Sequence, residues 1–488
     1  MATIAANDYS MPIGGEWVES EGGRFDVTNP ATGEVVGTAV NATAEDVTRA
    51  IDAAEQALGP WKALAAIERG RILRRASERI LAEADRIAGV MTDEQGKPLA
   101  EARGEVVYAA SFLEWFAGEA ERVYGMTLPP MNPDKRVLVL RQPVGVTAAI
   151  TPWNFPAAMM TRKLGPALAA GCTMIVKPAS ATPLTALEVV RCMEEAGVPA
   201  GVVNVITSRR TGEVASTLFG DPRVRKISFT GSTEVGKELI RASADQVKRL
   251  SLELGGHAPF VVFEDADIKE AVDDAMASKY RNAGQTCVCA NRIYVQRGIH
   301  AEFVKELARR AAAMKVGNGR EEGVVIGPLI DERGVAKAEE HVNDAVAKGA
   351  ELVVGGHRLT DGAFGSGSFY EPTVLDNVTE DMLIYREETF GPVAGVTVFD
   401  TEDEAIRMAN DTVYGLAAYF HTRDYARLLR VAERLEYGIV GANDGIISSA
   451  AAPFGGIKES GYGREGGPQG IDEYLDVKYV SIGHVGSL

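Results

Sequence analysis

The feature that most constrains the fold is a regular alternation of short apolar runs and helix-length segments across residues 144–263. Segments with helical spacing near 157–170, 182–196, 211–219 and 233–246 separate apolar runs at 146–150, 173–176, 202–206, 227–229 and 250–254. This order of strand, helix and strand is typical of a parallel sheet that is covered by helices. The sequence therefore predicts an α/β domain built on a parallel sheet in this region.

Ligands bind at the carboxyl ends of the strands in such a sheet, so the segments that follow the predicted strands are candidate binding loops. These segments are 152–156, 177–180, 207–210, 230–232 and 253–256. Asn154 could donate a hydrogen bond to a developing oxyanion, although a simple turn asparagine explains it equally well. Glu253 could act as a general base that activates a water molecule.

Lys177 and Ser180 bear on the kind of ligand that this sheet would bind. At the end of a strand, Lys177 could donate to ribose hydroxyls or to a phosphate, or it could simply extend its amine to solvent. Ser180 stands where a carboxylate would repel a 2′-phosphate. The absence of that carboxylate favours NADP over NAD as a cofactor.

A second α/β section follows, with strands expected near 259–263, 292–296, 351–354 and 394–399 and helices that include 267–282 and 301–314. Cys287 comes just after the first of these helices, in a polar segment that predicts a flexible loop and an exposed thiol. A thiolate is a strong nucleophile, and Glu253 could activate the water that releases a captured group. Cys172 and Cys192 are better explained as small buried residues.

Composition excludes several classes of protein. A chain of 488 residues is long enough for two or three domains, and its net charge of −17 argues against a nucleic-acid partner. No window approaches the run of about eighteen apolar residues that a membrane span needs, and the amino terminus lacks the pattern of a signal peptide. Four cysteines indicate a reducing compartment, so a cytoplasmic location is expected. The six histidines are scattered, and we expect no metal site.

Two glycine-rich segments suggest an alternative from another class, a P-loop phosphotransferase. Residues 231–237 have Walker A spacing, but Glu238 stands where a magnesium-binding Ser or Thr belongs. The loop could still hold a diphosphate, because its amides open a helix. Residues 461–466 spell G-x-G-x-x-G without a preceding strand or a following helix. The phosphotransferase is disfavoured, and binding of Mg-ATP rather than NADP would reveal it.

Six motifs resemble, in order, the motif set of the aldehyde dehydrogenase superfamily, and the resemblance runs the length of the chain. They lie at 151–156, 229–232, 253–256, 284–287, 388–392 and 453–456. The resemblance implies a parallel Rossmann-like cofactor-binding domain (1–122 and 143–253) and a second α/β catalytic domain that carries the nucleophile (254–460). It also implies a small β extension for oligomerisation (123–142 and 461–488) and a homo-oligomer, either a dimer or a tetramer.

The resemblance also implies the roles of individual residues. Cys287 attacks the aldehyde carbon, the amide of Asn154 and the Cys287 N–H hold the oxyanion, and Glu253 activates the water that hydrolyses a thioester. NADP is the implied cofactor, with use of NAD left open. The implied cofactor groove consists of Trp153, Lys177, Pro178, Ala179, Ser180, Thr230, Gly231, Ser232, Leu254, Glu388 and Phe390.

Residues 281–291 and 445–448 resemble, more narrowly, the succinate-semialdehyde dehydrogenases. In that group, residues at the positions of Arg162, Arg281 and Ser448 hold the distal carboxylate, and two guanidinium groups in one small pocket would make a strong anchor. The implied reaction is oxidation of succinate semialdehyde to succinate. Glutarate semialdehyde, or a broader range of aldehydes, is the alternative, because one methylene is worth only about 1–3 kcal/mol in a pocket.

Three further hypotheses accompany this interpretation. Arg209 and Arg210 could meet the 2′-phosphate of NADP. Cys289 could form a reversible disulfide with Cys287, if the two Cα atoms lie within about 7 Å. A scaffold without enzymatic activity could use the same fold, but the presence of all three implied catalytic residues argues against it.

Overall fold

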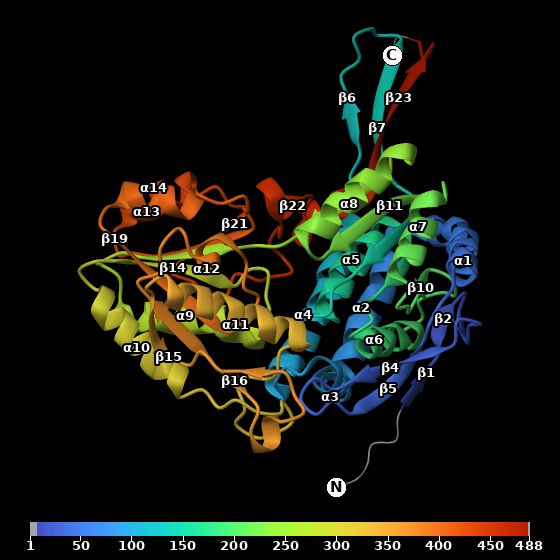
Figure 1. Cartoon of the computed structure of the whole chain (residues 1–488). Helices are drawn as coiled ribbons and strands as arrows, with labels where there is room; N and C mark the ends of the chain where they lie inside the picture. Colours follow the sequence, from blue (N-terminus) through green and yellow to red (C-terminus); the bar gives the residue numbers. More distant parts are fainter. Residues whose placement is uncertain (1–6, 487–488) are drawn as a thin grey trace.

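The computed structural model describes residues 7–486 and shows two α/β units side by side, with a narrow β arm that projects from the first (Figure 1). Within this range the first unit is built on a six-stranded sheet in the order β10-β9-β8-β11-β12-β22. Five of these strands are parallel and β22 is antiparallel to β12, which confirms the predicted parallel sheet. The strands are β8 (Val146–Ile150), β9 (Thr173–Lys177), β10 (Val203–Val205), β11 (Val224–Thr230), β12 (Arg249–Glu253) and β22 (Gly461–Tyr462).

The order of these strands creates a crevice for a ligand. The chain runs outward from β8 through β9 to β10 and then crosses to the other side of β8 to form β11. The strand order reverses between β8 and β11, and ligands bind at the carboxyl ends of the strands at such a point. The loop with Asn154 and the loop with Ser232 therefore flank one crevice.

Helices cover both faces of this sheet, as the buried residues of the strands require. On one face, Ala149 and Val176 belong to the same buried cluster as residues of α2, α4, α5 and α6. On the other face, Ala148 and Ile175 pack with residues of α1, α7 and α8. Successive strand residues point to opposite faces, so each strand serves two cores. The helices are α1 (Ala44–Ala63), α2 (Ala66–Ala82), α4 (Leu99–Glu119), α5 (Ala158–Ala170), α6 (Pro183–Glu195), α7 (Thr211–Gly220) and α8 (Thr233–Ser243).

The second unit contains a seven-stranded sheet in the order β15-β18-β19-β14-β13-β20-β21, counted over the described part of the chain. All of its neighbouring strands are parallel except β15 and β18. The strands are β13 (Ala258–Val262), β14 (Ala290–Gln296), β15 (Glu351–Val354), β18 (Thr373–Asp376), β19 (Val393–Phe399), β20 (Ala417–His421) and β21 (Ile439–Ala442). The helices are α9 (Ile268–Tyr280), α10 (His300–Ala312), α11 (Glu332–Ala347), α12 (Leu383–Arg386), α13 (Glu402–Asn410) and α14 (Tyr425–Arg434).

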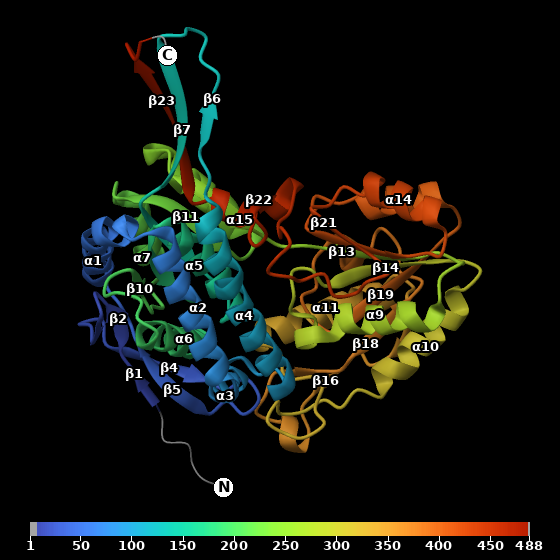
Figure 2. The ribbon, with the colours of Figure 1, turned by 180° about the vertical axis from the view of Figure 1, so that it is seen from behind.

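A sharp corner between α3 (Ala84–Gln95) and α4 brings the first unit against the second. Gly96 forms this corner with a φ of +93°, and a Cβ there would lie 2.6 Å from the ring of Pro328. The Leu99 N–H donates to the carbonyl of Gly319 in the second unit (3.0 Å). Seen from behind, α4 runs along the side of the first unit that faces the second (Figure 2). The corner is therefore placed where residues of both units meet.

Small sheets complete the periphery. β1 (Asn7–Tyr9), β5 (Val35–Val40) and β4 (Arg24–Thr28) form one sheet, and β2 (Met11–Ile13) pairs with β3 (Glu16–Val18). In the second unit, β16 (Arg358–Leu359) pairs with β17 (Phe369–Tyr370). No helix in residues 7–486 is long and apolar enough to cross a membrane.

The arm consists of β6 (Met126–Leu128), β7 (Lys135–Pro143) and β23 (Leu475–Gly483), and it projects from the first unit at the top of Figure 1. Strand β23 pairs with β7 along its whole length. Val477 and Tyr479 are 69% and 65% exposed on this arm. Both side chains are therefore largely uncovered in the single chain.

The segment 461–488, which the resemblance assigns to the oligomerisation extension, contacts the first unit before it enters the arm. Its first part belongs to the first unit, where β22 closes the sheet beside β12 and α15 (Gln469–Asp472) packs against α5. Gly461 has a φ of +109°, and a Cβ at this residue would lie 2.0 Å from the Leu252 carbonyl oxygen. Only glycine permits this close approach. The turn-rich sequence gave no sign of the pairing, because the strand has two residues.

Candidate active site

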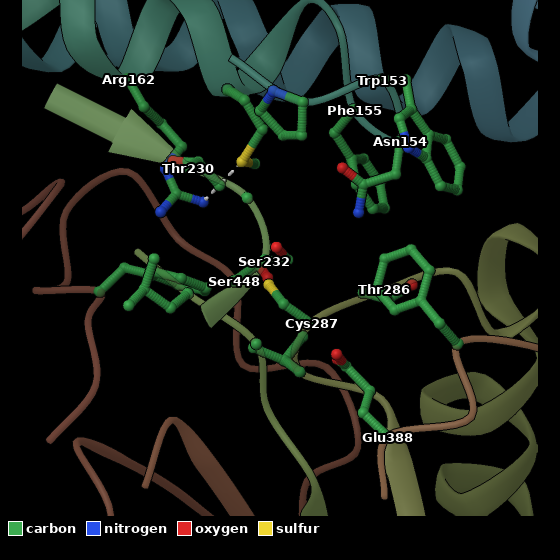
Figure 3. Close-up of a pocket in the computed structure, with 18 of the residues that line it drawn as sticks. Trp153, Asn154, Phe155, Arg162, Thr230, Ser232, Thr286, Cys287, Glu388 and Ser448 are labelled. Atoms are coloured by element: carbon green, nitrogen blue, oxygen red, sulfur yellow. Dashed lines mark hydrogen bonds between the residues drawn. The ribbon is translucent and has the colours of Figure 1, made fainter. Parts of the chain in front are cut away.

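A cavity of about 270 Å³ lies where loops of the two units meet (Figure 3). Residues from both units line it, so neither unit forms it alone. The structure brings together most of the side chains that the sequence singled out, but Glu253, Lys177, Pro178, Ala179 and Ser180 are outside the lining. The singled-out residues in the lining are Trp153, Asn154, Arg162, Thr230, Gly231, Ser232, Leu254, Arg281, Cys287, Glu388, Phe390 and Ser448.

The loop that carries Cys287 is held firmly, which corrects the expectation of a flexible segment. After α9 ends, Asn282 and Ala283 adopt left-handed backbone with φ values of 52° and 54°. The Asn282 N–H donates to Glu101 (2.8 Å). Gln285 is buried, and its side chain accepts a hydrogen bond from a backbone N–H of the second unit (2.8 Å). Strained backbone persists only where surrounding contacts fix it, so these bonds are the physical reason for the rigidity.

The Cys287 side chain is partly exposed on the wall of the cavity (Figure 3). Desolvation raises the pKa of its thiol to about 12, while the positive charges of Arg162 and Arg281 act in the opposite direction. Cys289 is buried, and its Sγ donates to the carbonyl of Lys279 (3.4 Å). The disulfide between the two cysteines stays a prediction.

Asn154 follows β8, and its side chain points into the open space above Cys287 (Figure 3). Its Nδ2 donates to the carbonyl of Gln285 (2.9 Å), which leaves a second amide proton for a ligand. Its own backbone carbonyl accepts from Lys97 Nζ (2.7 Å) and from Asn282 Nδ2 (3.1 Å). The amide is therefore fixed before any ligand arrives, which is what stabilisation of an oxyanion requires.

Glu253 ends β12 and is 3% exposed. Its Oε2 has no hydrogen-bond partner in residues 7–486. Burial, followed by the negative charge of Glu465, raises the pKa of Glu253 well above its ordinary value. A Cβ on Gly455 would lie 2.8 Å from Glu253 Oε1, so glycine there leaves room for the carboxylate. A buried carboxylate with a raised pKa and a free oxygen is suited to accept a proton.

Glu465 is a buried carboxylate that the sequence did not reveal. Arg162 Nη2 lies 2.7 Å from Glu465 Oε2, and Lys163 contacts the other carboxylate oxygen. Although burial alone would raise it, these two cations hold the pKa of Glu465 below its ordinary value. The Arg162 guanidinium also lies 3.9 Å from the ring centroid of Phe454. The positive charge of Arg162 is thus paired with Glu465 inside the protein. We had expected a guanidinium that is free to bind a substrate carboxylate.

Arg281, in contrast, remains available to bind a substrate carboxylate. It forms no ion pair with any described residue, its Nε has no hydrogen-bond partner there, and its guanidinium lies 5.3 Å from the ring centroid of Phe155. Tyr108, Phe155, Arg281 and Ser448 line both the first cavity and a second one of about 290 Å³. The two cavities are therefore adjacent, and Arg281 is one of the residues that they share.

Groups at the carboxyl ends of β9 and β11 have the chemistry that a dinucleotide would need. Lys177 is buried at the end of β9, and burial lowers its pKa to about 8. Within the described chain its Nζ donates only to the Pro178 carbonyl (3.2 Å), so two further protons are available for ribose or phosphate oxygens. Ser232 precedes α8 and its Oγ accepts the N–H of Val235 (3.4 Å). The positive end of this helix favours a phosphate.

Trp153 of the first unit lies in the same cavity lining as Glu388 and Phe390 of the second unit. The rings of Trp153 and Phe390 make an edge contact, with centroids 5.6 Å apart. Glu388 Oε1 accepts the N–H of Gly256 (3.2 Å), and burial raises the pKa of Glu388 to about 7. An aromatic pair and a fixed carboxylate suit a ring and a ribose hydroxyl.

Three further basic residues that the sequence offered for phosphate binding, Lys237, Arg209 and Arg210, have partners within the protein. Lys237 pairs with Glu459 (2.8 Å), so the lysine that a P-loop needs for a phosphate is engaged elsewhere. Arg209 donates to the carbonyl of Asp26 (2.8 Å), and Arg210 lies 3.9 Å from Glu213. Contact of either arginine with a 2′-phosphate stays a prediction.

Sequence reasoning missed several lining residues, namely Tyr108, Phe155, Met159, Val288 and Phe454. Tyr108 lies on α4, and nothing in the sequence of that helix separates a residue of a cavity wall from a residue of the packed core. Its hydroxyl is buried and has no hydrogen-bond partner among residues 7–486. The quoted motifs offered a signal for three of the others, since Phe155 lies in 151–156, Val288 in 281–291 and Phe454 in 453–456.

Comparison with known proteins gives a consistent result. A family model described as the aldehyde dehydrogenase family matches residues 17–480. The glutarate-semialdehyde dehydrogenase of Pseudomonas putida is 56% identical over 96% of this chain and 97% of its own length. The NADP(+) succinate-semialdehyde dehydrogenase of Escherichia coli is 55% identical over 96% and 97%. The crystal structure of an aldehyde dehydrogenase from Brucella melitensis biovar abortus is 57% identical, covers 97% of each chain and superimposes with a TM-score of 0.95.

Proposed function

The chain belongs to the aldehyde dehydrogenase family, and from that premise we propose that it oxidises succinate semialdehyde to succinate with NADP as the preferred cofactor. The observation that carries this proposal is the presence in one cavity of the Cys287 thiol, the Asn154 amide and the unpaired Arg281 guanidinium. A thiol and an amide suit an aldehyde, and a guanidinium suits a carboxylate at the other end of a short molecule. The two semialdehyde dehydrogenases above support the same class of substrate.

In the proposed reaction, the Cys287 thiol first gives its proton to solvent water, and the thiolate sulfur then bonds to the aldehyde carbon. The carbonyl electrons move to the oxygen, whose charge the Asn154 amide and the Cys287 N–H stabilise. The cofactor supplies a hydride acceptor when it is bound. A thioester on Cys287 remains after the hydride has left. Glu253 then takes a proton from water, the hydroxide adds to the thioester carbon, and the Cys287 thiolate leaves.

The proposed cofactor site follows the crevice at the switch point. Lys177 would donate to a ribose or a phosphate, and the amides at the start of α8 would face the diphosphate. Glu388 and the aromatic pair would hold the nicotinamide end. The proposed set is Trp153, Lys177, Pro178, Ala179, Ser180, Thr230, Gly231, Ser232, Leu254, Glu388 and Phe390.

Replacing Ser180 by glutamate is expected to raise the KM for NADP at least about tenfold, because a carboxylate there would repel the 2′-phosphate. The KM for NAD should change much less. Steady-state kinetics with each cofactor measures the two values. Ser180→Gln has similar size without charge and serves as the control. Equal changes for both cofactors would contradict the placement of Ser180 beside the 2′-phosphate.

Replacing Arg281 by methionine is expected to lower kcat/KM for succinate semialdehyde about 100-fold, mainly through KM, because the buried carboxylate would lose its charge partner. The value for an uncharged aldehyde such as butanal should fall less than about threefold. Arg162→Met is the matched comparison. It removes one of the two cations that pair with Glu465 and leaves only Lys163, so we expect it to impair both aldehydes alike. An equal loss for the two aldehydes in the Arg281 variant would overturn the anchor.

Glutarate semialdehyde is the second candidate substrate. A second cavity of about 290 Å³ lies beside the first and shares Arg281 with it, and a relative of 56% identity is a glutarate-semialdehyde dehydrogenase. Steady-state comparison of both semialdehydes with both cofactors tests the whole proposal. If neither semialdehyde is oxidised, the proposal is refuted. Hydrolysis of ATP, or transfer of its phosphate, would favour the P-loop phosphotransferase.

We also propose that the chain forms a homo-oligomer, a dimer or a tetramer, and acts in the cytoplasm. The exposed apolar residues of the arm support an assembly. The four cysteines of the chain are free thiols, which supports a reducing compartment. Light scattering of the purified protein measures the assembly directly.

A further inference from the structure

The corner between α3 and α4 contains a buried ion pair that takes no direct part in the proposed reaction. Lys97 is 2% exposed and Glu105 is 3% exposed, and their charged groups are in contact. Desolvation of two buried charges is costly unless further hydrogen bonds satisfy both partners. Here both partners make such bonds, and the bonds reach the loop that carries Asn154.

The ion pair holds both ends of the segment 154–158. Lys97 Nζ donates to the carbonyl of Asn154 (2.7 Å). Glu105 Oε1 accepts the N–H groups of Ala157 (3.0 Å) and Ala158 (3.3 Å), where α5 begins. One pair of opposite charges therefore fixes this segment at its start and at its end.

The same corner also holds the loop that precedes Cys287. Gln95 Nε2 donates to Asn282 Oδ1 (3.0 Å), and Gln95 Oε1 accepts the N–H of Lys97 (3.0 Å). Glu101 accepts the Asn282 N–H (2.8 Å). The Asn282 amide in turn donates to the Asn154 carbonyl (3.1 Å). Both sets of bonds thus converge on the Asn154 carbonyl, so the corner fixes the amide loop and the nucleophile loop relative to each other.

We propose that Lys97, supported by Glu105, is a positioning residue for aldehyde oxidation and acts through Asn154. The inference rests on the proposed function, in which Asn154 stabilises the oxyanion formed at Cys287. Lys97 does not line the cavity of Cys287, although it lines the adjacent cavity of about 290 Å³. Its link to the oxyanion donor is the hydrogen bond to the Asn154 carbonyl, so its effect on Asn154 is transmitted through that backbone group. A donor to an oxyanion must be placed within about 0.5 Å, and a displacement of about 1 Å can reduce the rate about 100-fold.

The test is a double-mutant cycle between Lys97 and Asn154. Lys97→Met is expected to lower kcat about 100-fold while the KM for NADP changes less than about threefold. In an Asn154→Ala background, the same Lys97 substitution should cost less than about threefold in kcat, because the amide that it positions is gone. A full further loss in that background, or an unchanged kcat in the single Lys97→Met variant, would overturn the proposal.

A matched control separates positioning from general stability. Arg69 is also a buried cation of the first unit, and it donates to the carbonyls of Ala169 (3.1 Å) and Leu64 (2.6 Å). Arg69→Met is expected to lower Tm without lowering kcat at a temperature where the protein is folded. If it lowers kcat as much as Lys97→Met, the loss reflects destabilisation and positioning by Lys97 is refuted.

A second variant covers failure of the first to fold. Glu105→Gln keeps an oxygen for the N–H of Ala157 but removes the charge that holds Lys97. We expect about a tenfold loss of kcat that disappears in the Asn154→Ala background, and an undiminished loss there would refute the proposal. The proposed function is tested apart from this, because wild-type turnover of succinate semialdehyde decides it without any variant.

Discussion

Replacement of Cys287 by alanine is expected to lower kcat for aldehyde oxidation by about 10⁴-fold or more. The covalent route ends without the sulfur, and what remains is binding and the oxyanion donors. Cys289 cannot take over, because it is buried and its thiol is directed at the Lys279 carbonyl. Formation of the reduced cofactor with succinate semialdehyde measures the rate.

Cys289→Ala is the matched control for this variant. It removes a sulfur two residues away and should retain activity within about threefold, since no step of the proposed reaction uses it. Substantial turnover by Cys287→Ala would refute the covalent mechanism. Loss of activity in both variants alike would assign the effect to the loop rather than to the nucleophile.

Replacement of Glu253 by glutamine is expected to lower the steady-state rate about 10³-fold while the first turnover proceeds. The amide cannot accept a proton from water, so the thioester accumulates on Cys287. Rapid mixing should show one equivalent of reduced cofactor per active site, and mass spectrometry should find the acyl group on the peptide that contains Cys287. Slow turnover without a burst would mean that Glu253 acts in formation of the thioester rather than in its hydrolysis.

The pH dependence of thioester hydrolysis follows from the same carboxylate. The base must be ionised to accept a proton, and burial raises the pKa of Glu253 well above its ordinary value. The rate of hydrolysis should therefore rise with pH through that raised pKa and level off above it. Single-turnover hydrolysis in wild type and in Glu253→Gln compares the two profiles, and the rise should be absent from the variant.

The sheet and most of the cavity could be predicted because they obey rules that act locally along the chain. Strands of a parallel sheet end at one edge, so loops that are far apart in sequence meet there. Asn154 after β8, Ser232 after β11 and Glu253 at the end of β12 come together for this reason. The family comparison and the TM-score confirm the fold that the strand and helix pattern predicted.

The rest depends on partners that no local pattern reveals. Lys163 and Glu465 are 302 residues apart, and only the folded chain shows that they form a buried pair. The loop before Cys287 looks flexible because its residues are polar, yet most of it is buried. It is fixed by the hydrogen bond that the Asn282 N–H donates to Glu101 and by the one that Gln285 accepts from the Ile330 N–H. Polar composition predicts exposure on average, and it fails where the polar groups satisfy one another.

Strand β22 has a consequence for biosynthesis. The sheet of the first unit is almost complete once residue 253 has left the ribosome, but its edge beside β12 stays open until residues 461 and 462 emerge. The same late segment delivers Glu465, without which Arg162 and Lys163 would be buried without a counter-charge. Domains generally fold in the order of their synthesis, but here the first unit is completed only by residues 461–465, which follow the whole second unit along the chain. Premature termination near residue 460 should therefore yield a chain that cells degrade rather than a smaller working enzyme.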